Sequence, residues 1–314
     1  MADFKLLNYA DPSGKPRPGL LVGDKDVIDL SRAVKAWEKV AGRKAGFLAD
    51  STISVLANWS TALPVLHRIA GAPGIKPRTL SRSKLLAPLL YPPGIFCAGA
   101  NYKKHAMEMS VDGKTFPDKS RVQPYFFLKS GPHCVIGPGA EIRLPRISNM
   151  IDWEAEFAVV IGRPCRNVGA AEARDYVAGY TIMNDLSARD QGRREDWPNF
   201  RTDWLGHKNF ETAAPMGPWI TPADQIADPY KCRMQLWVNR TKMQDEYISD
   251  LIFNIEEQIE WLSRRMTLQP GDVISTGTPS GVGRPRGIFL KPGDKVRISI
   301  DGIGELVNPV VQGE

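Results

Sequence analysis

Two glutamates lie two positions apart inside an otherwise apolar run, Glu154 and Glu156 in Asp-Trp-Glu-Ala-Glu-Phe-Ala-Val-Val-Ile-Gly at residues 152–162. A β-strand turns alternate side chains to the same face, so these carboxylates are expected about 7 Å apart and pointing the same way. Apolar residues occupy both faces of the run, which predicts a strand that is buried on both sides. Buried carboxylates need a compensating cation.

Alternating glutamates also occur on the wet face of an edge strand, because charged side chains are mostly exposed. A third acid favours the metal hypothesis. The apolar stretch 179–183 leads into Asn184 and Asp185, which places Asp185 at the tip of a second predicted strand. Two glutamates and an aspartate suit Mg²⁺, Mn²⁺ or Ca²⁺, whereas zinc prefers cysteine and histidine. The sequence therefore predicts a divalent-metal site at Glu154, Glu156 and Asp185.

A possible general base lies in the segment Asn-Tyr-Lys-Lys-His-Ala-Met-Glu at residues 101–108. On a helical turn His105 and Glu108 share one face, and the carboxylate then fixes the imidazole tautomer and raises its basicity. A solvated surface pair is the alternative interpretation. Lys208, just before an apolar and turn-rich segment, is a candidate for stabilising an enolate or carboxylate, although a lone lysine is ordinarily solvated.

Composition limits the classes of protein. With 314 residues, 42% hydrophobic and 24% charged, the chain has enough length for a full core and a small second domain. The formal charge of +6 is spread thinly, which favours a small anionic substrate over nucleic acid. No apolar run approaches the roughly 20 residues of a membrane helix. Four scattered cysteines and an N-terminus without an apolar signal core predict a reduced, cytoplasmic protein.

The chain is expected to divide near residue 85. Residues 1–85 are predicted to form a small α+β domain with a linker, and residues 86–314 a larger, mostly β catalytic domain. The proline-rich stretch 71–94 is expected to be an extended connector. Further predicted elements are strands at 4–8, 19–22 and 27–30, helices from Ser31 and over 250–266, and a hairpin over 295–311. A glycine-rich turn at 276–283 fits neither a phosphate-binding loop nor a serine-hydrolase elbow.

In their order along residues 90–311, the motifs resemble the fumarylacetoacetate hydrolase (FAH) family. The matching strings are Asn101-Tyr-x-x-His105-Ala-x-Glu108, Phe127-Leu-Lys129, Asp152-Trp-Glu154-Ala-Glu156, Asp185-Leu-Ser-Ala-Arg189-Asp190, Lys208 and the glycine-rich run 271–283. No single string is decisive, but their order and combination are highly specific. The resemblance implies an α+β, mostly β fold with a FAH-like mixed β-roll, a homodimer, and Mg²⁺ or Mn²⁺ on the three carboxylates.

Members of this family hydrolyse C–C bonds in 2-oxo and 1,3-dicarbonyl acids, and relatives decarboxylate, hydrate or tautomerise similar acids through a metal-held enolate. The resemblance implies that His105 and Glu108 activate water and that Lys208 stabilises the enolate. It also implies that substrate oxygens are bound by Lys129, Arg189, Gln191 and Thr278. Many relatives carry the glutamine three residues after the arginine, where this chain has Gly192 and the glutamine is Gln191. The orientation of the substrate is therefore open.

The favoured prediction is a metal-dependent hydrolase of a 2,4-diketo acid such as an acylpyruvate. A decarboxylase, hydratase or isomerase of a related 2-oxo acid shares every motif named above, and a catalytically silent binding homologue is the third hypothesis. The segment that carries His105 and Glu108 and runs to about Gln123 is predicted to form a lid over the site. The arginine-rich stretch 191–205 is expected to build either a specificity wall or a solvated insertion.

Overall fold

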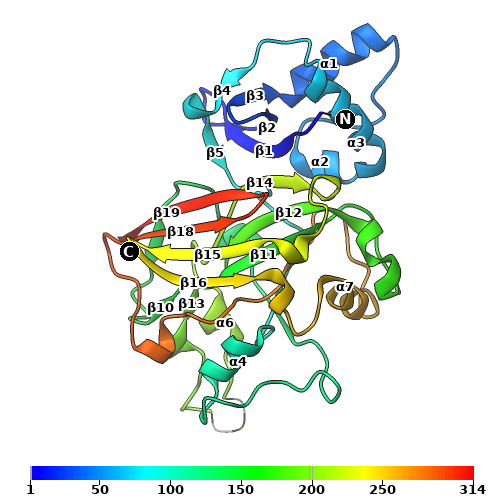
Figure 1. The fold of residues 1–314 in the computed structure, drawn as a ribbon. Helices are drawn as coiled ribbons and strands as arrows, with labels where there is room; N and C mark the ends of the chain where they lie inside the picture. Colours follow the sequence, from blue (N-terminus) through cyan, green and yellow to red (C-terminus); the bar gives the residue numbers. More distant parts are fainter. Residues whose placement is uncertain (1, 198, 200) are drawn as a thin grey trace.

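The computed structural model describes residues 2–197, 199 and 201–314. One long sheet runs through the whole molecule, from the small N-terminal unit at the top of Figure 1 into the larger unit below it. β5 (Lys84–Leu86) and β8 (Val135–Ile136) pair with this sheet beside its main path. Its order is β4 (Arg78–Thr79), β3 (Asp26–Asp29), β2 (Pro16–Val22), β1 (Lys5–Ala10), β14 (Ala214–Pro222), β12 (Val177–Asn184), β11 (Ala155–Ile161), β17 (Val273–Ser275), β6 (Ile95–Ala98) and β7 (Phe126–Leu128).

A second sheet packs over the middle of the first, where β15 meets β11 and β18 meets β12. Its order is β16 (Thr241–Tyr247), β15 (Arg233–Val238), β18 (Lys295–Ile300), β19 (Gly304–Gln312) and β9 (Ile142–Leu144). The β18–β19 pair is the hairpin predicted from alternating residues. A short pair, β10 (Ile151–Asp152) with β13 (Ser187–Ala188), lies beside the two sheets. The prediction of an α+β, mostly β fold is confirmed.

The N-terminal unit carries three helices, α1 (Leu30–Ala41), α2 (Thr52–Leu56) and α3 (Trp59–Gly71). It joins the larger unit through β1, which pairs with β14 at Leu6 and Ile220. The expectation of an extended connector without regular structure over 71–94 is wrong, because β4 pairs with β3 and β5 pairs with β1. These short strands satisfy backbone groups that the sheet edge would otherwise leave unpaired. β5 also crosses the boundary predicted at residue 85.

The helix predicted over 250–266 is shorter than expected: α7 spans Ile255–Ser263. Its N-cap is Asn254, whose side chain forms a capping box with Glu257. The side chain of Asn101 bonds both the N–H and the carbonyl of Phe253, and this holds the preceding residues outside the helix. The other helical elements are α4 (Lys103–Met109), α5 (Gly131–Cys134), α6 (Trp204–Lys208), η1 (Leu80–Arg82), η2 (Ala170–Tyr176), η3 (Arg189–Gln191), η4 (Ala223–Gln225), η5 (Pro229–Lys231), η6 (Ile248–Asp250) and η7 (Arg284–Arg286).

The β11 strand lies at the centre of the core. All of its residues are buried, since β12 and β17 pair with its edges and the second sheet covers it. This confirms the strand predicted from the apolar run. The four cysteines are free and buried. Among the described residues, no helix has the length and apolar character needed to cross a membrane.

Candidate active site

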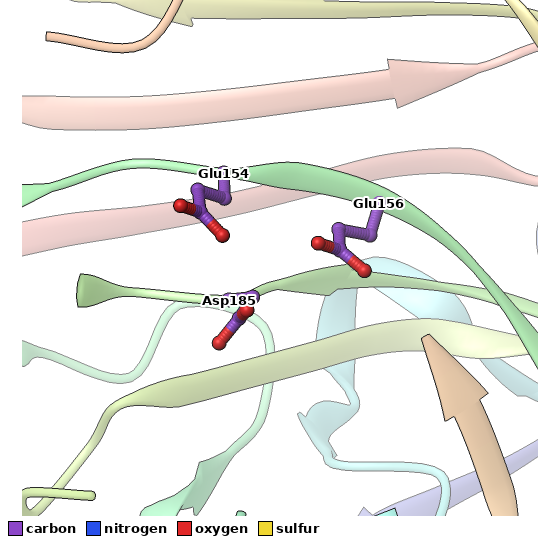
Figure 2. Close-up of side chains that lie close together, drawn as sticks. All are labelled: Glu154, Glu156 and Asp185. Atoms are coloured by element: carbon purple, nitrogen blue, oxygen red, sulfur yellow. The ribbon is translucent and has the colours of Figure 1, made fainter. Parts of the chain in front are cut away.

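Three acidic side chains converge in the middle of the large sheet (Figure 2). Glu154 directly precedes β11, Glu156 is the second residue of that strand, and Asp185 follows the last residue of the neighbouring β12. The two strands are locked in register there, because the N–H of Asp185 donates to the Glu154 carbonyl at 2.9 Å. One carboxylate oxygen of each residue lies within 4.8 Å of the others. The exposed fractions of Glu154, Glu156 and Asp185 are 5%, 1% and 0%.

Lys208 ends α6 and extends its buried ammonium into this cluster. Its Nζ lies 2.7 Å from a carboxylate oxygen of Glu154 and 2.7 Å from one of Asp185. The solvated alternative for this lysine is therefore excluded, since the side chain is part of the buried charge network. Lys208 is placed to meet negative charge that develops beside these two acids.

Lys129 approaches Asp185 from the other side, with Nζ at 2.8 Å from Oδ1. Its ammonium also donates to the carbonyls of Leu186 and Lys208. Its hydrogen bonds therefore go to two backbone carbonyls, and its contact with Asp185 is an ion pair. The side chain is completely buried. This arrangement favours a role in holding Asp185 over the substrate contact that the family resemblance implies.

Arg189 lies between two acids at the edge of the cluster. Its Nη2 is 2.6 Å from Glu154 and its Nε is 2.8 Å from Asp152. Asp152 is also buried and accepts hydrogen bonds from the backbone of Gly283 and Arg284. Asp152 therefore anchors the arginine to the glycine-rich loop. Sequence reasoning missed this role, and the only signal was the position of Asp152 next to the glutamate pair.

The charges of the two glutamates are not equivalent. Burial alone would raise the pKa of Glu154, but Lys208, Arg189 and His105 hold it well below its usual range. Burial, together with the charges of Asp185 and Glu154, raises the pKa of Glu156 well above its usual range. Among the described residues no lysine or arginine forms an ion pair with Glu156, although Gly277 N–H donates to it at 2.9 Å.

The difference in charge compensation between Glu154 and Glu156 tests whether the three carboxylates fit a divalent cation. Three buried carboxylates converge, and the one without a basic partner needs positive charge to ionise. An all-oxygen donor set suits a hard divalent ion. The residues therefore fit such an ion, in agreement with the site predicted from the sequence.

His105 and Glu108 lie on α4, where the imidazole Nδ1 is 2.9 Å from a carboxylate oxygen of Glu108. Both oxygens of Glu108 also accept the N–H of Gly281 at 3.0 Å. His105 is buried and is among the groups that lower the pKa of Glu154, so the ring lies near the acidic cluster. The predicted geometry of a histidine oriented by an acid is confirmed, and a purely solvated pair is excluded.

The glycine-rich loop over 276–283 links the separate parts of the site. Backbone N–H groups of Gly277, Gly281 and Gly283 donate to Glu156, Glu108 and Asp152 respectively. Gly281 has a φ of 108°, and a Cβ there would lie 2.0 Å from the Met243 carbonyl oxygen. Glycine is therefore required. The sequence excluded a phosphate loop here but did not indicate a scaffold for carboxylates.

Two predicted substrate contacts differ in their placement. Thr278 is buried within the glycine-rich loop, beside the residue that bonds Glu156. Gln191 is less buried, and its side-chain amide donates to the Ile147 carbonyl at 2.6 Å. In the arginine-rich stretch, Arg193 and Arg194 pair with the neighbouring Glu195 and Asp196 on the surface. These pairs favour the solvated insertion over a specificity wall.

The fold and this site define an enzyme scaffold with a buried acidic centre for a divalent ion. Comparison with known proteins identifies the family: the model described as "Fumarylacetoacetate (FAA) hydrolase C-terminal" matches residues 94–311. This is well over half of the chain. The protein therefore belongs to the fumarylacetoacetate hydrolase family, which confirms the resemblance found in the sequence.

The relatives carry different activities. The chain is 40% identical to "Oxaloacetate tautomerase fahd2, mitochondrial" of Xenopus laevis over 236 residues, covering 74% of this chain and 70% of the relative. It is 31% identical to maleylpyruvate hydrolase from Sphingobium sp. SYK-6, a structure in complex with manganese(II) ion and pyruvate, with a TM-score of 0.74 and coverage of 99% and 100%. The 5-carboxymethyl-2-hydroxymuconate delta-isomerase of Mycobacterium smegmatis is 32% identical, with a TM-score of 0.70 and coverage of 98% and 99%.

Proposed function

We propose that the protein is a divalent-metal enzyme that hydrolyses a C–C bond of a 2,4-diketo acid, such as an acylpyruvate, by way of an enolate. The observation that carries the proposal is the buried His105–Glu108 pair beside the acidic centre. A small anionic acid as substrate is consistent with the maleylpyruvate hydrolase structure, which is a complex with manganese(II) ion and pyruvate. Mg²⁺ or Mn²⁺ is the proposed ion, a homodimer the proposed assembly and the cytoplasm the proposed location.

A divalent ion on Glu154, Glu156 and Asp185 would supply a Lewis acid for the 2-oxo carboxylate end of the substrate. The protein side chains contribute the remaining chemistry. His105 takes a proton from water, which then adds to the carbonyl carbon farther from the carboxylate. Glu108 holds the imidazole in the tautomer that has a free Nε2 and stabilises the charged ring.

Lys208 then meets the negative charge of the departing enolate. Its ammonium is buried, so the interaction is stronger than in water. Arg189 is held by Asp152 and Glu154 and is proposed to orient the substrate carboxylate. The C–C bond next to the attacked carbon breaks, the pyruvate-like enolate takes up at carbon the proton that His105 removed from water, and the distal acyl group leaves as a carboxylic acid.

A second candidate is keto–enol tautomerisation of oxaloacetate, favoured by the 40% identity to a relative with that name. The same base can move a proton between carbon and oxygen without adding water. The two functions differ in one step, namely the addition of water to a carbonyl carbon. Decarboxylation and hydration use the same centre, and no feature of the described residues favours them specifically.

Turnover in ¹⁸O-labelled water separates the two candidates. Hydrolysis predicts two carboxylate products from an acylpyruvate, with one solvent oxygen in the acid derived from the distal acyl group. The label is read on that acid, because pyruvate exchanges its ketone oxygen. Isomerisation without cleavage, with rapid loss of the enol absorbance of oxaloacetate, would replace hydrolysis by tautomerisation. Release of carbon dioxide from the best substrate would overturn both.

A further inference from the structure

One buried side chain outside the predicted site connects two of its parts. Gln244 lies on β16 of the second sheet and is 1% exposed. Its Oε1 accepts the backbone N–H of Ala155, the residue between Glu154 and Glu156, at 3.0 Å. Its Nε2 donates to Thr278 Oγ1 at 2.9 Å and to the Pro279 carbonyl at 2.8 Å. Gln244 therefore joins the acidic strand to the glycine-rich loop.

These partners fix which way the amide points. The Ala155 N–H can only donate, so it must face the amide oxygen of Gln244. The Pro279 carbonyl can only accept, so it must face the amide nitrogen. In a flipped amide, the amide nitrogen would face the Ala155 N–H, which is also a donor. The amide oxygen would face the Pro279 carbonyl, which is also an acceptor. The hydrogen that points at Thr278 is therefore set by the backbone, and Thr278 Oγ1 must act as its acceptor.

The hydroxyl of Thr278 is left with a proton that needs another acceptor. Within the described part of the chain its one hydrogen bond is the one from Gln244. Thr278 is 3% exposed, and a buried hydroxyl proton without a partner is costly unless a ligand supplies an oxygen. The preceding residue, Gly277, already bonds Glu156, so this hydroxyl lies next to the acidic centre.

We infer that Gln244 is a positioning residue that holds the Thr278 hydroxyl as a hydrogen-bond donor toward a carboxylate oxygen of the substrate. The inference rests on the proposed function only in that the ligand is a 2-oxo acid. Gln244 does not touch the substrate itself. A glutamate at this position keeps the bond from Ala155 but offers Thr278 an acceptor, so the hydroxyl turns its proton away from the site.

The test is a double-mutant cycle read by binding, which does not depend on knowing the substrate. The affinity of oxalate for the Mn²⁺-loaded protein is measured by calorimetry for wild type, Q244E, T278V and the double variant, together with the Mn²⁺ affinity alone. T278V and Q244E are each expected to lower the affinity for oxalate roughly 10- to 100-fold, as for a lost hydrogen bond to a charged group. T278V leaves Mn²⁺ affinity unchanged, and the double variant binds oxalate no more weakly than the weaker single variant.

Matched variants exclude simple explanations. T278S keeps the hydroxyl and is expected to bind oxalate like wild type, but to lose that affinity when combined with Q244E. Q269E introduces the same charge at an exposed position and is expected to change nothing. If Q244E does not fold, Q244M takes its place; its smaller loss must likewise disappear in the T278V background.

Losses that multiply in the double variant would overturn the inference, because they would mean that Gln244 acts by charge or general structure. An unchanged oxalate affinity in T278V, or no oxalate binding by the wild type, would overturn it as well. Failure to cleave any acylpyruvate while the coupling persists would instead reject the proposed hydrolysis alone.

Discussion

Lys208 Nζ lies 2.7 Å from Oε2 of Glu154, inside the acidic cluster and not on the surface. The same ammonium is 2.7 Å from Asp185, so its single positive charge contacts two of the three carboxylates that are proposed to hold the ion. A fixed positive charge that is already desolvated needs little rearrangement when negative charge forms next to it. This contact therefore suggests that the lysine serves the reaction more than the metal.

Replacement of Lys208 by methionine is expected to lower kcat by about 10²- to 10³-fold, the range for a lost electrostatic contact in the transition state. Mn²⁺ affinity should be equal to or higher than that of wild type, since a competing cation is removed. Steady-state kinetics and metal titration measure the two effects. The exposed Lys231→Met variant serves as control. Weaker metal binding in Lys208→Met would assign the lysine to the metal site instead.

Loss of the His105 imidazole should lower the rate of turnover and leave the affinity for the metal unchanged. His105→Ala is expected to reduce turnover about 10²- to 10⁴-fold, as for a lost general base, with Mn²⁺ affinity intact. Glu108→Gln should give a smaller loss, because the imidazole remains. His133 is exposed, and His133→Ala controls for the substitution. Near-wild-type turnover in His105→Ala would exclude this residue from catalysis.

Within the described part of the chain Glu156 forms no ion pair with a basic residue, so its charge should depend most on the ion. Glu156→Gln is expected to lower the affinity for Mn²⁺ by more than the roughly 10- to 100-fold typical of losing an outer-shell contact. Removal of metal by a chelator should abolish turnover, and added Mg²⁺ or Mn²⁺ should restore it. Glu305→Gln, at an exposed position, is the control for isothermal titration. Full turnover of metal-free protein would reject the metal requirement.

The parts of the site that could be predicted from the sequence depend on local geometry. The period of two in a strand brings Glu154 and Glu156 together, and the helical spacing of three pairs His105 with Glu108. Asp185 was predicted because an apolar run stops directly before it. These relations need no knowledge of the rest of the chain.

The parts that were missed depend on contacts between distant segments. Gln244 lies in a strand with an ordinary alternating pattern, and its partners in β11 and the glycine-rich loop are 89 and 34 residues away. Asn101 shortens the predicted helix from a position 152 residues earlier. Such contacts leave no periodic signal, so local propensity predicted a longer helix and gave Gln244 no role.

His207 offers a pH-dependent readout of the packing around α6. Burial, followed by the nearby charges of Lys208 and Arg189, lowers the pKa of His207 to about 3. In the unfolded chain this imidazole binds a proton near pH 6.5, whereas in the folded protein it does so only near pH 3. The free energy of unfolding therefore rises with pH between these two values. From pH 7 to 5 this residue should reduce the free energy of unfolding by at most about 2 kcal/mol.

Denaturant titration of wild type and His207→Gln at pH 7, 6 and 5, in the presence of chelator, measures this contribution. The variant lacks the titrating ring, so its stability should fall less over the same pH range. His133→Ala should follow wild type, because the ring of His133 is exposed in the folded protein. Parallel pH profiles for wild type and His207→Gln would mean that the imidazole is protonated in the folded state.

Lys129 provides the complementary test to Lys208. Its ammonium donates to two backbone carbonyls and forms a buried ion pair with Asp185. Lys129→Met removes one partner of a buried pair and should cost about 3 to 5 kcal/mol of unfolding free energy. Because Asp185 loses its fixed orientation, Mn²⁺ should bind about 10- to 100-fold more weakly, as for other outer-shell losses.

The two lysine variants should therefore separate two roles that sequence alone does not distinguish. Lys129→Met is expected to lower metal affinity, with kcat largely recovered at saturating Mn²⁺, whereas Lys208→Met is expected to lower kcat at every Mn²⁺ concentration. Chemical denaturation and Mn²⁺ titration of both proteins, followed by kinetics across a range of Mn²⁺, make the comparison. If Lys129→Met keeps wild-type metal affinity but raises KM for the substrate at saturating Mn²⁺, the lysine contacts the substrate, and the role in holding Asp185 is wrong.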